Sequence, residues 1–243
     1  MKDLGHAGET ACATNASRLF AKVGQAVSPA TPARDGLSSG PGEHTHGFIK
    51  GVVRRIDLSD ARLAERLDEY QRNRLFRGVQ FRLGDEIPAA FAELARRGIP
   101  VDLEIEPRQL PMLARIAEAA PELRIVIDDL GAPPYGSPMS DEWAQGMEEA
   151  ARFPQVFCKA NDLIARAPAP WKAADIRPYV RHALAVFGPR RLMFGSGWPC
   201  CLPAAGWKET LAAFTQSIGA QTLAVREELL GGTAVRFYGL EAA

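Results

Sequence analysis

The stretch LMFGSGWP, residues 192–199, determines how the rest of this chain is interpreted. Its apolar run stops at a Gly-Ser-Gly turn, and an apolar run bounded by turn residues is typical of a buried strand. Gly195 and Gly197 allow backbone conformations in which a ligand can approach the chain closely. Because α/β folds carry their active sites at the carboxyl ends of strands, we expect a functional site here.

On the N-terminal side of this stretch, short apolar runs alternate with segments in which apolar residues recur at helical spacing. Strands are expected at 51–58, 76–83, 101–106, 124–130, 156–161 and 191–196. Helices are expected from a cap at Ser59, over 88–97, 110–119, 140–152 and 176–187, and then over 207–217, 223–230 and 234–238. Such alternation indicates an α/β fold with a parallel sheet, because parallel neighbours need a crossover. A complete (β/α)8 barrel has eight strands, so six predict an incomplete barrel of the TIM type.

The first part of the chain has a different composition. Residues 1–47 are rich in Ala, Gly, Ser, Thr and Pro, and residues 28–42 have too few large apolar side chains to offset the entropy of ordering them. We expect a mobile arm over 1–47, in which only 17–27 has the pattern of a short amphipathic helix. Residues 48–243 are long enough for one barrel domain.

Charge and hydropathy exclude several classes of partner. The 243 residues contain 29 Lys and Arg and 29 Asp and Glu, so the net charge is zero and neither nucleic acid nor an anionic membrane is an expected partner. No apolar stretch approaches the ~20 residues of a membrane span, and the N-terminus lacks a signal pattern. We therefore expect a cytoplasmic protein with a small-molecule substrate.

A series of motifs appears in a fixed order between residues 48 and 240. They are VVRRIDLSD at 52–60, LFRGV at 75–79, PRQLP at 107–111, DDLGAP at 128–133, FCKANDL at 157–163, FGSGWP at 194–199 and GGTAVRFYGL at 231–240. They resemble those of amidohydrolase family 2, the branch that holds the fuconolactonases and the 2-pyrone-4,6-dicarboxylate hydrolases. The resemblance implies a distorted (β/α)8 barrel, with the six expected strands as its third to eighth, and hydrolysis of a lactone.

Several pocket positions differ from the family pattern. The family has its general base, an Asp, where this chain has Gly197, and a pocket His where it has Asp129. Gln80 and Ala132 likewise replace an Arg and a Lys of the family. Two hypotheses remain open: a hydrolase of lactones or cyclic esters that bear a carboxylate, or a non-catalytic relative with a binding or interaction role.

Hydrolysis without a metal needs a base for the water and donors for the substrate and its oxyanion. Asp129 is the expected base, since it follows Asp128 at a strand end and the two should point to opposite faces, with Asp129 toward the barrel interior. Arg82 and Lys159 are expected to bind a substrate carboxylate, and Asn161 to donate a hydrogen bond. Each of these side chains is otherwise explained by a structural ion pair or a solvated strand end.

The sequence predicts neither a metal nor a cofactor. Zinc needs several converging nitrogen, sulfur or carboxylate ligands, but His182 falls inside an expected helix. The pair His44 and His46 has the letters of the family's first-strand motif, but it stands directly before the expected third strand, so we interpret both as surface residues. Carboxylates near strand ends, such as Glu104 and Asp162, could converge on a hard cation. They are ordinarily satisfied by backbone amides and solvent instead.

An incomplete barrel also makes a prediction about assembly. Closure removes the free edges of a sheet, and without it the strands at 51–58 and 191–196 each present unpaired backbone groups. We therefore expect self-association through open sheet edges, giving a homo-oligomer.

Overall fold

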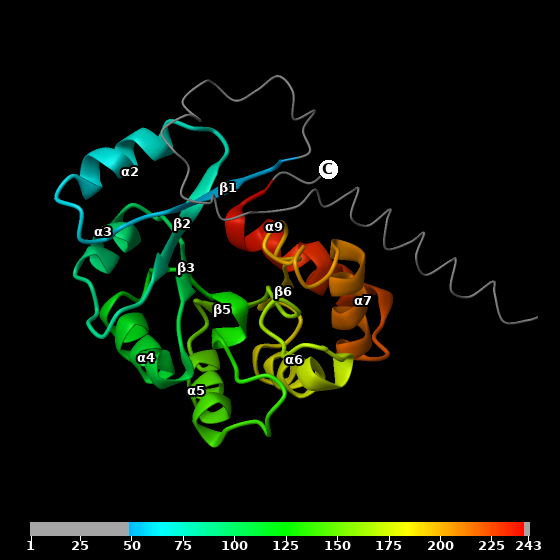
Figure 1. Ribbon diagram of the computed structural model, residues 1–243. Coiled ribbons are helices and arrows are strands. Elements are labelled where there is room, and N and C mark those ends of the chain that lie inside the picture. Colours follow the sequence, from blue (N-terminus) through cyan, green and yellow to red (C-terminus); the bar gives the residue numbers. More distant parts are fainter. Residues whose placement is uncertain (1–48, 241–243) are drawn as a thin grey trace, which may run out of the picture.

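The computed structural model of the protein describes residues 49–240 (Figure 1). The predicted arm over 1–47 and its helix over 17–27 lie outside the described residues. Six strands form one sheet in the order in which they occur along the chain, and each pair of neighbours is parallel. The strands are β1 Val52–Arg55, β2 Phe76–Arg82, β3 Val101–Glu104, β4 Ile125–Ile127, β5 Val156–Ala160 and β6 Leu192–Phe194. This is the order of successive strands in a (β/α) barrel, which confirms the predicted fold class.

A helix follows each of the first five strands, and three more follow β6. They are α2 Leu63–Gln71, α3 Ala90–Arg96, α4 Leu110–Ala119, α5 Asp141–Ala151, α6 Ala173–Phe187, α7 Trp207–Ile218, α8 Leu223–Glu227 and α9 Thr233–Tyr238. A π-helical turn, Glu228–Gly232, joins α8 to α9. None of the helices in this range has the length and apolarity needed to cross a membrane.

Several helix ends differ from the prediction: α6 begins at Ala173 and not at 176, and α8 ends at Glu227 and not at 230. Ser140 caps α5 by accepting a hydrogen bond from the Trp143 amide at 3.3 Å, as predicted. The predicted cap at Ser59 is wrong: its hydroxyl donates to Asp57, and α2 begins at Leu63. The reason is that two short Asx turns, built on Asp57 and Asp60, occupy the segment in which the helix was expected to start.

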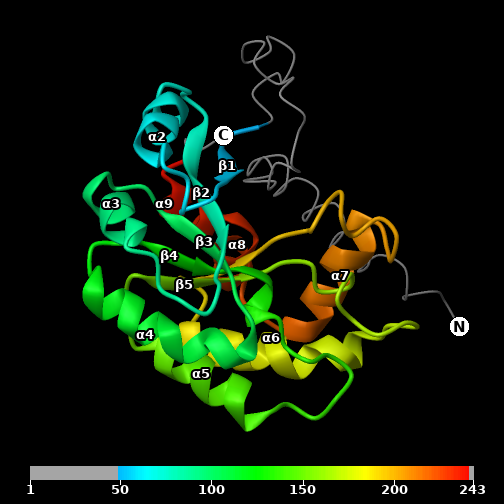
Figure 2. The ribbon, with the colours of Figure 1, turned by 60° about the vertical axis from the view of Figure 1, so that its left-hand side comes forward.

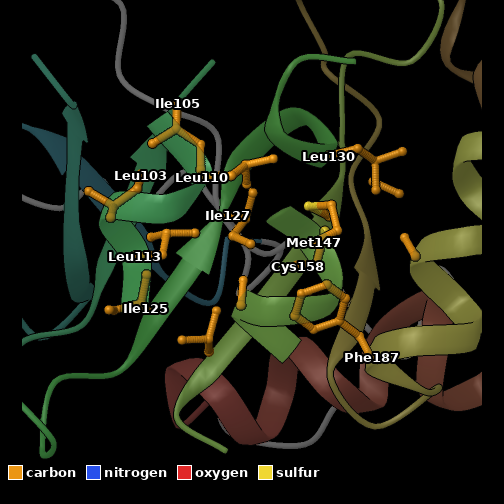
Figure 3. Packing of buried hydrophobic residues seen from close by; sticks show 14 of the residues in the cluster. Leu103, Ile105, Leu110, Leu113, Ile125, Ile127, Leu130, Met147, Cys158 and Phe187 are labelled. Carbon is orange, nitrogen blue, oxygen red and sulfur yellow. The ribbon is translucent and has the colours of Figure 1, made fainter. Parts of the chain in front are cut away.

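The main core lies between the sheet and helices α3 to α6. Alternate strand residues point to one face, where Leu103, Ile125, Ile127 and Cys158 pack against Leu113 and Met147 (Figure 3). Figure 2 shows α4, α5 and α6 lying along this side of the sheet. Burial of such side chains contributes about 1.5–3 kcal/mol each. This core fixes the outer face of the sheet and leaves the inner face for the site.

Helix α9 packs on the inner face near the start of the strands. Val53, Val126 and Met193 form a second apolar cluster with Phe237 and Tyr238 of α9. Further along the strands the inner face becomes polar, with Gln80, Asp102 and Lys159 buried on β2, β3 and β5. A functional site is therefore expected at the carboxyl ends of the strands. Within the described range β1 pairs only with β2 and β6 only with β5, so the sheet is not closed by these strands.

Candidate active site

Each of three successive strands is followed, within three residues of its end, by a residue with a left-handed backbone. Asp129 after β4 has φ +51°, Asp162 after β5 has φ +48°, and Gly197 after β6 has φ +68°. A non-glycine residue in this region costs on the order of 1–3 kcal/mol, and such residues gather at functional sites. The strained positions therefore mark the carboxyl ends of β4 to β6 as the candidate site.

The turn after β4 does not orient its two acids as predicted. The strand ends at Ile127, and a 3-10 turn over Asp128–Gly131 contains Asp129 and Leu130 in the left-handed region. Asp128 continues the alternation of Val126 and joins Gln80 and Lys159 on the inner face, so the prediction that Asp129 is the one that faces the interior is wrong. The Trp143 indole donates to the Leu130 carbonyl at 2.8 Å and holds the turn in place.

Asp129 is buried and its carboxylate is held by two side chains. Asn161 Nδ2 donates to Oδ1 at 3.0 Å, and Arg166 donates to Oδ2 through Nε at 3.1 Å and Nη2 at 2.9 Å. Burial and the charge of Asp128 raise the pKa of Asp129, against the opposing effect of Arg166. The predicted base Asp129 and the predicted donor Asn161 thus lie in one cluster.

Asp128 belongs to a separate, fully buried network. Lys159 Nζ lies 2.5 Å from Asp102 and 3.0 Å from Asp128, and Gln80 donates to Asp128 at 2.8 Å. The Tyr238 hydroxyl lies 2.8 Å from both oxygens of Asp102. Burial raises the pKa of Asp102 to about 6, while Lys159 opposes the shift and Asp128 adds to it. Lys159, predicted to bind substrate, is engaged by two carboxylates beneath the site.

Arg82, the other predicted carboxylate-binding residue, lies at the open end of β2. Its side chain is 70% exposed, and its Nε donates to Glu104 at 2.9 Å. Arg55 of β1 donates to the same carboxylate at 2.6 Å. Two guanidinium groups therefore share one acid, Glu104, at the carboxyl ends of β1 to β3.

Arg166 is a site residue that the sequence analysis did not identify. It lies in the segment after β5, where its amide donates to the Asp162 carbonyl at 3.1 Å, and its side chain is 38% exposed. It reaches from Asp129 to an open depression, also lined by Glu106, Pro107, Arg108, Ala132, Pro134, Ser140 and Glu142. The sequence holds one indication of such a residue: an acid that is buried, as Asp129 is, needs a positively charged partner.

Asp162 is also part of the candidate site, since its carboxyl group interacts with Asp129 and Arg166. Its Oδ1 is buried and accepts no hydrogen bond from any residue in the described range. Burial, with a further contribution from Asp129, raises the pKa of Asp162 to about 7, although Arg166 opposes the shift. A carboxyl group that titrates near neutrality is suited to proton transfer.

The donors in this part of the chain do not form a zinc site. Over residues 49–240 no three His, Cys, Asp or Glu side chains come together as metal ligands. His182 lies on α6, where its ring contacts the Ala144 carbonyl at 3.2 Å. His44 and His46 are outside the described residues.

Comparison with known proteins gives both a family match and curated relatives. A family model described as amidohydrolase matches residues 42–240. An L-fucono-1,5-lactonase from Burkholderia ambifaria is 32% identical over 209 residues, which are 80% of this chain and 72% of that protein. An L-fucono-1,5-lactonase from Burkholderia multivorans is 33% identical over 216 residues, with 79% and 72% covered.

Solved structures resemble the chain over a similar length. A zinc-bound amidohydrolase from Burkholderia multivorans has a TM-score of 0.72 at 32% identity, covering 80% of this chain and 75% of its own. The same protein with bound HEPES has a TM-score of 0.73 at 27% identity, with 95% and 88% covered. A third structure is a candidate 2-pyrone-4,6-dicarboxylic acid hydrolase from Pseudomonas putida, with 23% identity and a TM-score of 0.65. The match covers 79% of this chain and 73% of that one, and it supports the fold alone.

Proposed function

Because the chain belongs to the amidohydrolase family, we propose that it hydrolyses a lactone or another cyclic ester that bears a carboxylate. The curated relatives named as L-fucono-1,5-lactonases, each more than 30% identical over about four fifths of this chain, support this class of reaction. The observation that carries the proposal is the pair of Asp129 and Arg166, a buried acid bound to a cation that borders an open depression.

Arginine side chains provide the recognition of a substrate carboxylate. A guanidinium group binds a carboxylate through two parallel hydrogen bonds, and Arg166 is already oriented by its two bonds to Asp129. Arg82 adds a second cation, exposed at the end of β2. In this proposal Arg166 and Arg82 select acidic substrates, and Asn161 stabilises the oxygen on which charge develops.

Ring opening requires a carboxylate that removes a proton from water. The sequence predicts Asp129 for this role, and its burial supports the prediction because it raises the pKa toward neutrality. Both oxygens of Asp129, however, accept hydrogen bonds from Asn161 or Arg166. Asp129 therefore acts at least as the group that orients these two side chains.

The alternative function is a non-catalytic relative that binds small acids. The glycine at position 197 favours it, because the family motif carries its base there. Arg166 beside the depression and Arg82 at the end of β2 then serve for binding alone.

Hydrolysis of a panel of lactones, with and without a carboxylate, distinguishes the two functions. We expect turnover by the wild type and a loss of about 10²–10⁴-fold in Asp129→Asn. Asp68→Asn, an exposed position on α2, is the control and should retain full activity. Absence of turnover, together with retained binding of a hydroxy acid, would establish the non-catalytic function instead.

A further inference from the structure

Asp162 occupies the space that a side chain at position 197 would need. A Cβ atom built on Gly197 lies 1.9 Å from Asp162 Oδ1 and 3.1 Å from its Cγ. Because real Cβ contacts do not fall below about 3.0 Å, the two positions cannot both carry a side chain in this geometry. The Asp162 carboxylate, from the segment after β5, thus lies directly against the backbone of Gly197 in the segment after β6.

The local structure of Asp162 is unfavourable in two independent ways. Its backbone lies in the left-handed region, at φ +48°, and its buried Oδ1 has no hydrogen-bond donor among residues 49–240. A buried acceptor left unsatisfied costs about 1–3 kcal/mol. A residue that combines strain with an unsatisfied oxygen is explained by function better than by stability.

Burial is the main reason that the pKa of Asp162 is raised to about 7. The carboxylates Asp129, Asp128 and Glu104 add to the shift, while Arg166 opposes it. Asp129 differs because its own oxygens are held by Arg166 and Asn161. Of the two acids, Asp162 is therefore the one that keeps an oxygen without a hydrogen-bond donor among residues 49–240.

We propose that Asp162 is the catalytic base, in the space left by Gly197, with Asp129 as a positioning residue; this rests on the proposed function. The Asp162 carboxylate removes a proton from water, and the water oxygen bonds to the lactone carbonyl carbon. The ring C–O bond then breaks, and Asp162 returns the proton to the departing ring oxygen. One water is consumed, a hydroxy acid is formed and the carboxylate is regenerated.

The test compares wild type, Asp162→Asn and the swapped variant Gly197→Asp/Asp162→Gly in hydrolysis of the best lactone of the panel. We expect Asp162→Asn to lose about 10²–10⁴-fold in kcat. The wild-type pH profile of kcat/KM should fall below about pH 7, since the base must be ionised. The swapped variant returns a carboxylate to the same space from β6 and should regain at least about tenfold over Asp162→Asn. A structural role for Asp162 predicts no such rescue.

The outcomes separate this assignment from the proposed function. Turnover by the wild type, with Asp162→Asn within about threefold of it, overturns the assignment and leaves the function intact. A wild type without turnover on any lactone overturns the function and, with it, the assignment. If the swapped variant does not fold, carbon-13 NMR titration of Asp162 in the wild type decides the matter: a pKa near 7 supports the assignment, and a pKa near the ordinary 3.8 overturns it.

Discussion

Gly188 and Gly197 have nearly the same φ angle but different surroundings. Alanine at each position therefore compares the cost of backbone strain with the cost of crowding. Gly197 has φ +68° and Gly188 has φ +67°, but a Cβ at Gly188 meets nothing within 4 Å. Gly188→Ala should therefore destabilise the protein by about 1 kcal/mol through its backbone alone. Gly197→Ala must also displace the Asp162 carboxylate, and should cost at least about 1 kcal/mol more.

Urea unfolding of the two alanine variants at one pH measures this difference. Equal losses of unfolding free energy would contradict the close approach of Asp162 to position 197. The same carboxylate also bears on the effect of pH.

Asp162 should make the folded state less stable as pH rises. Its folded pKa of about 7 lies above the unfolded value near 3.8, so the folded state holds the proton more tightly between these values. Stability from this group is therefore full below about pH 4, falls as pH rises and is lost above about pH 7. Asp162→Asn should be more stable than wild type near pH 8, with the difference vanishing near pH 4.

Unfolding free energies measured across this range check the prediction. Asp102, with a folded pKa of about 6, acts in the same direction and should leave a residual slope between about pH 4 and 6 in Asp162→Asn. A variant less stable than wild type near pH 8 would show that Asp162 stabilises the fold instead.

Lys159 should be among the residues whose loss destabilises the protein most. Its ammonium neutralises Asp102 and Asp128, and all three side chains are buried. Lys159→Met leaves two buried acids without their cation and should cost about 3–5 kcal/mol. Lys208→Met on the exposed face of α7 is the matched control, expected within about 0.5 kcal/mol of wild type. A small loss in Lys159→Met, measured by thermal or urea unfolding, would contradict the buried network.

At the scale of single elements, two serines with similar sequence contexts should behave differently. Ser140 caps α5, so Ser140→Ala should cost about 1 kcal/mol. Ser59 only closes a turn with Asp57, and Ser59→Ala should cost about 0.5 kcal/mol or less. Thermal unfolding of both variants tests the two assignments, and an equal loss would show that Ser59 has a capping role after all.

The elements themselves could be predicted because local patterns specify them. The apolar runs at 125–127 and 192–194 are buried strands, and Gly98 and Gly188 follow α3 and α6 as expected. The turn after β4 could not be predicted, because Asp129 and Leu130 adopt left-handed angles that their residue types do not announce. Tertiary contacts, such as the Trp143 bond to Leu130, impose them.

The same distinction explains the candidate site. Asp129 and Asn161 can be predicted because each lies at the carboxyl end of an expected strand, and the two are hydrogen-bonded. The pairing of Asp129 with Arg166, and of Asp162 with Gly197, spans more than thirty residues and arises only when β4, β5 and β6 pair. Spacing along the chain carries no signal for such contacts.

At the scale of the whole molecule, the strand order predicts self-association. Among residues 49–240, β1 and β6 each have a single partner, and free strand edges pair readily with other chains. We expect the apparent mass in size-exclusion chromatography with light scattering to rise with protein concentration. A monomer of constant mass at all concentrations would show that these edges are protected.

Helix α9 has a consequence for how the protein is made. Tyr238 binds Asp102 across 136 residues of sequence, and Arg124 donates to the Phe237 carbonyl. On the ribosome, strands β1 to β6 are made before this helix, so Asp102 and Lys159 lack the cover of Tyr238 until α9 has emerged. The inner face of the sheet should therefore reach its final packing only after α9 has been synthesised, however early the six strands have paired.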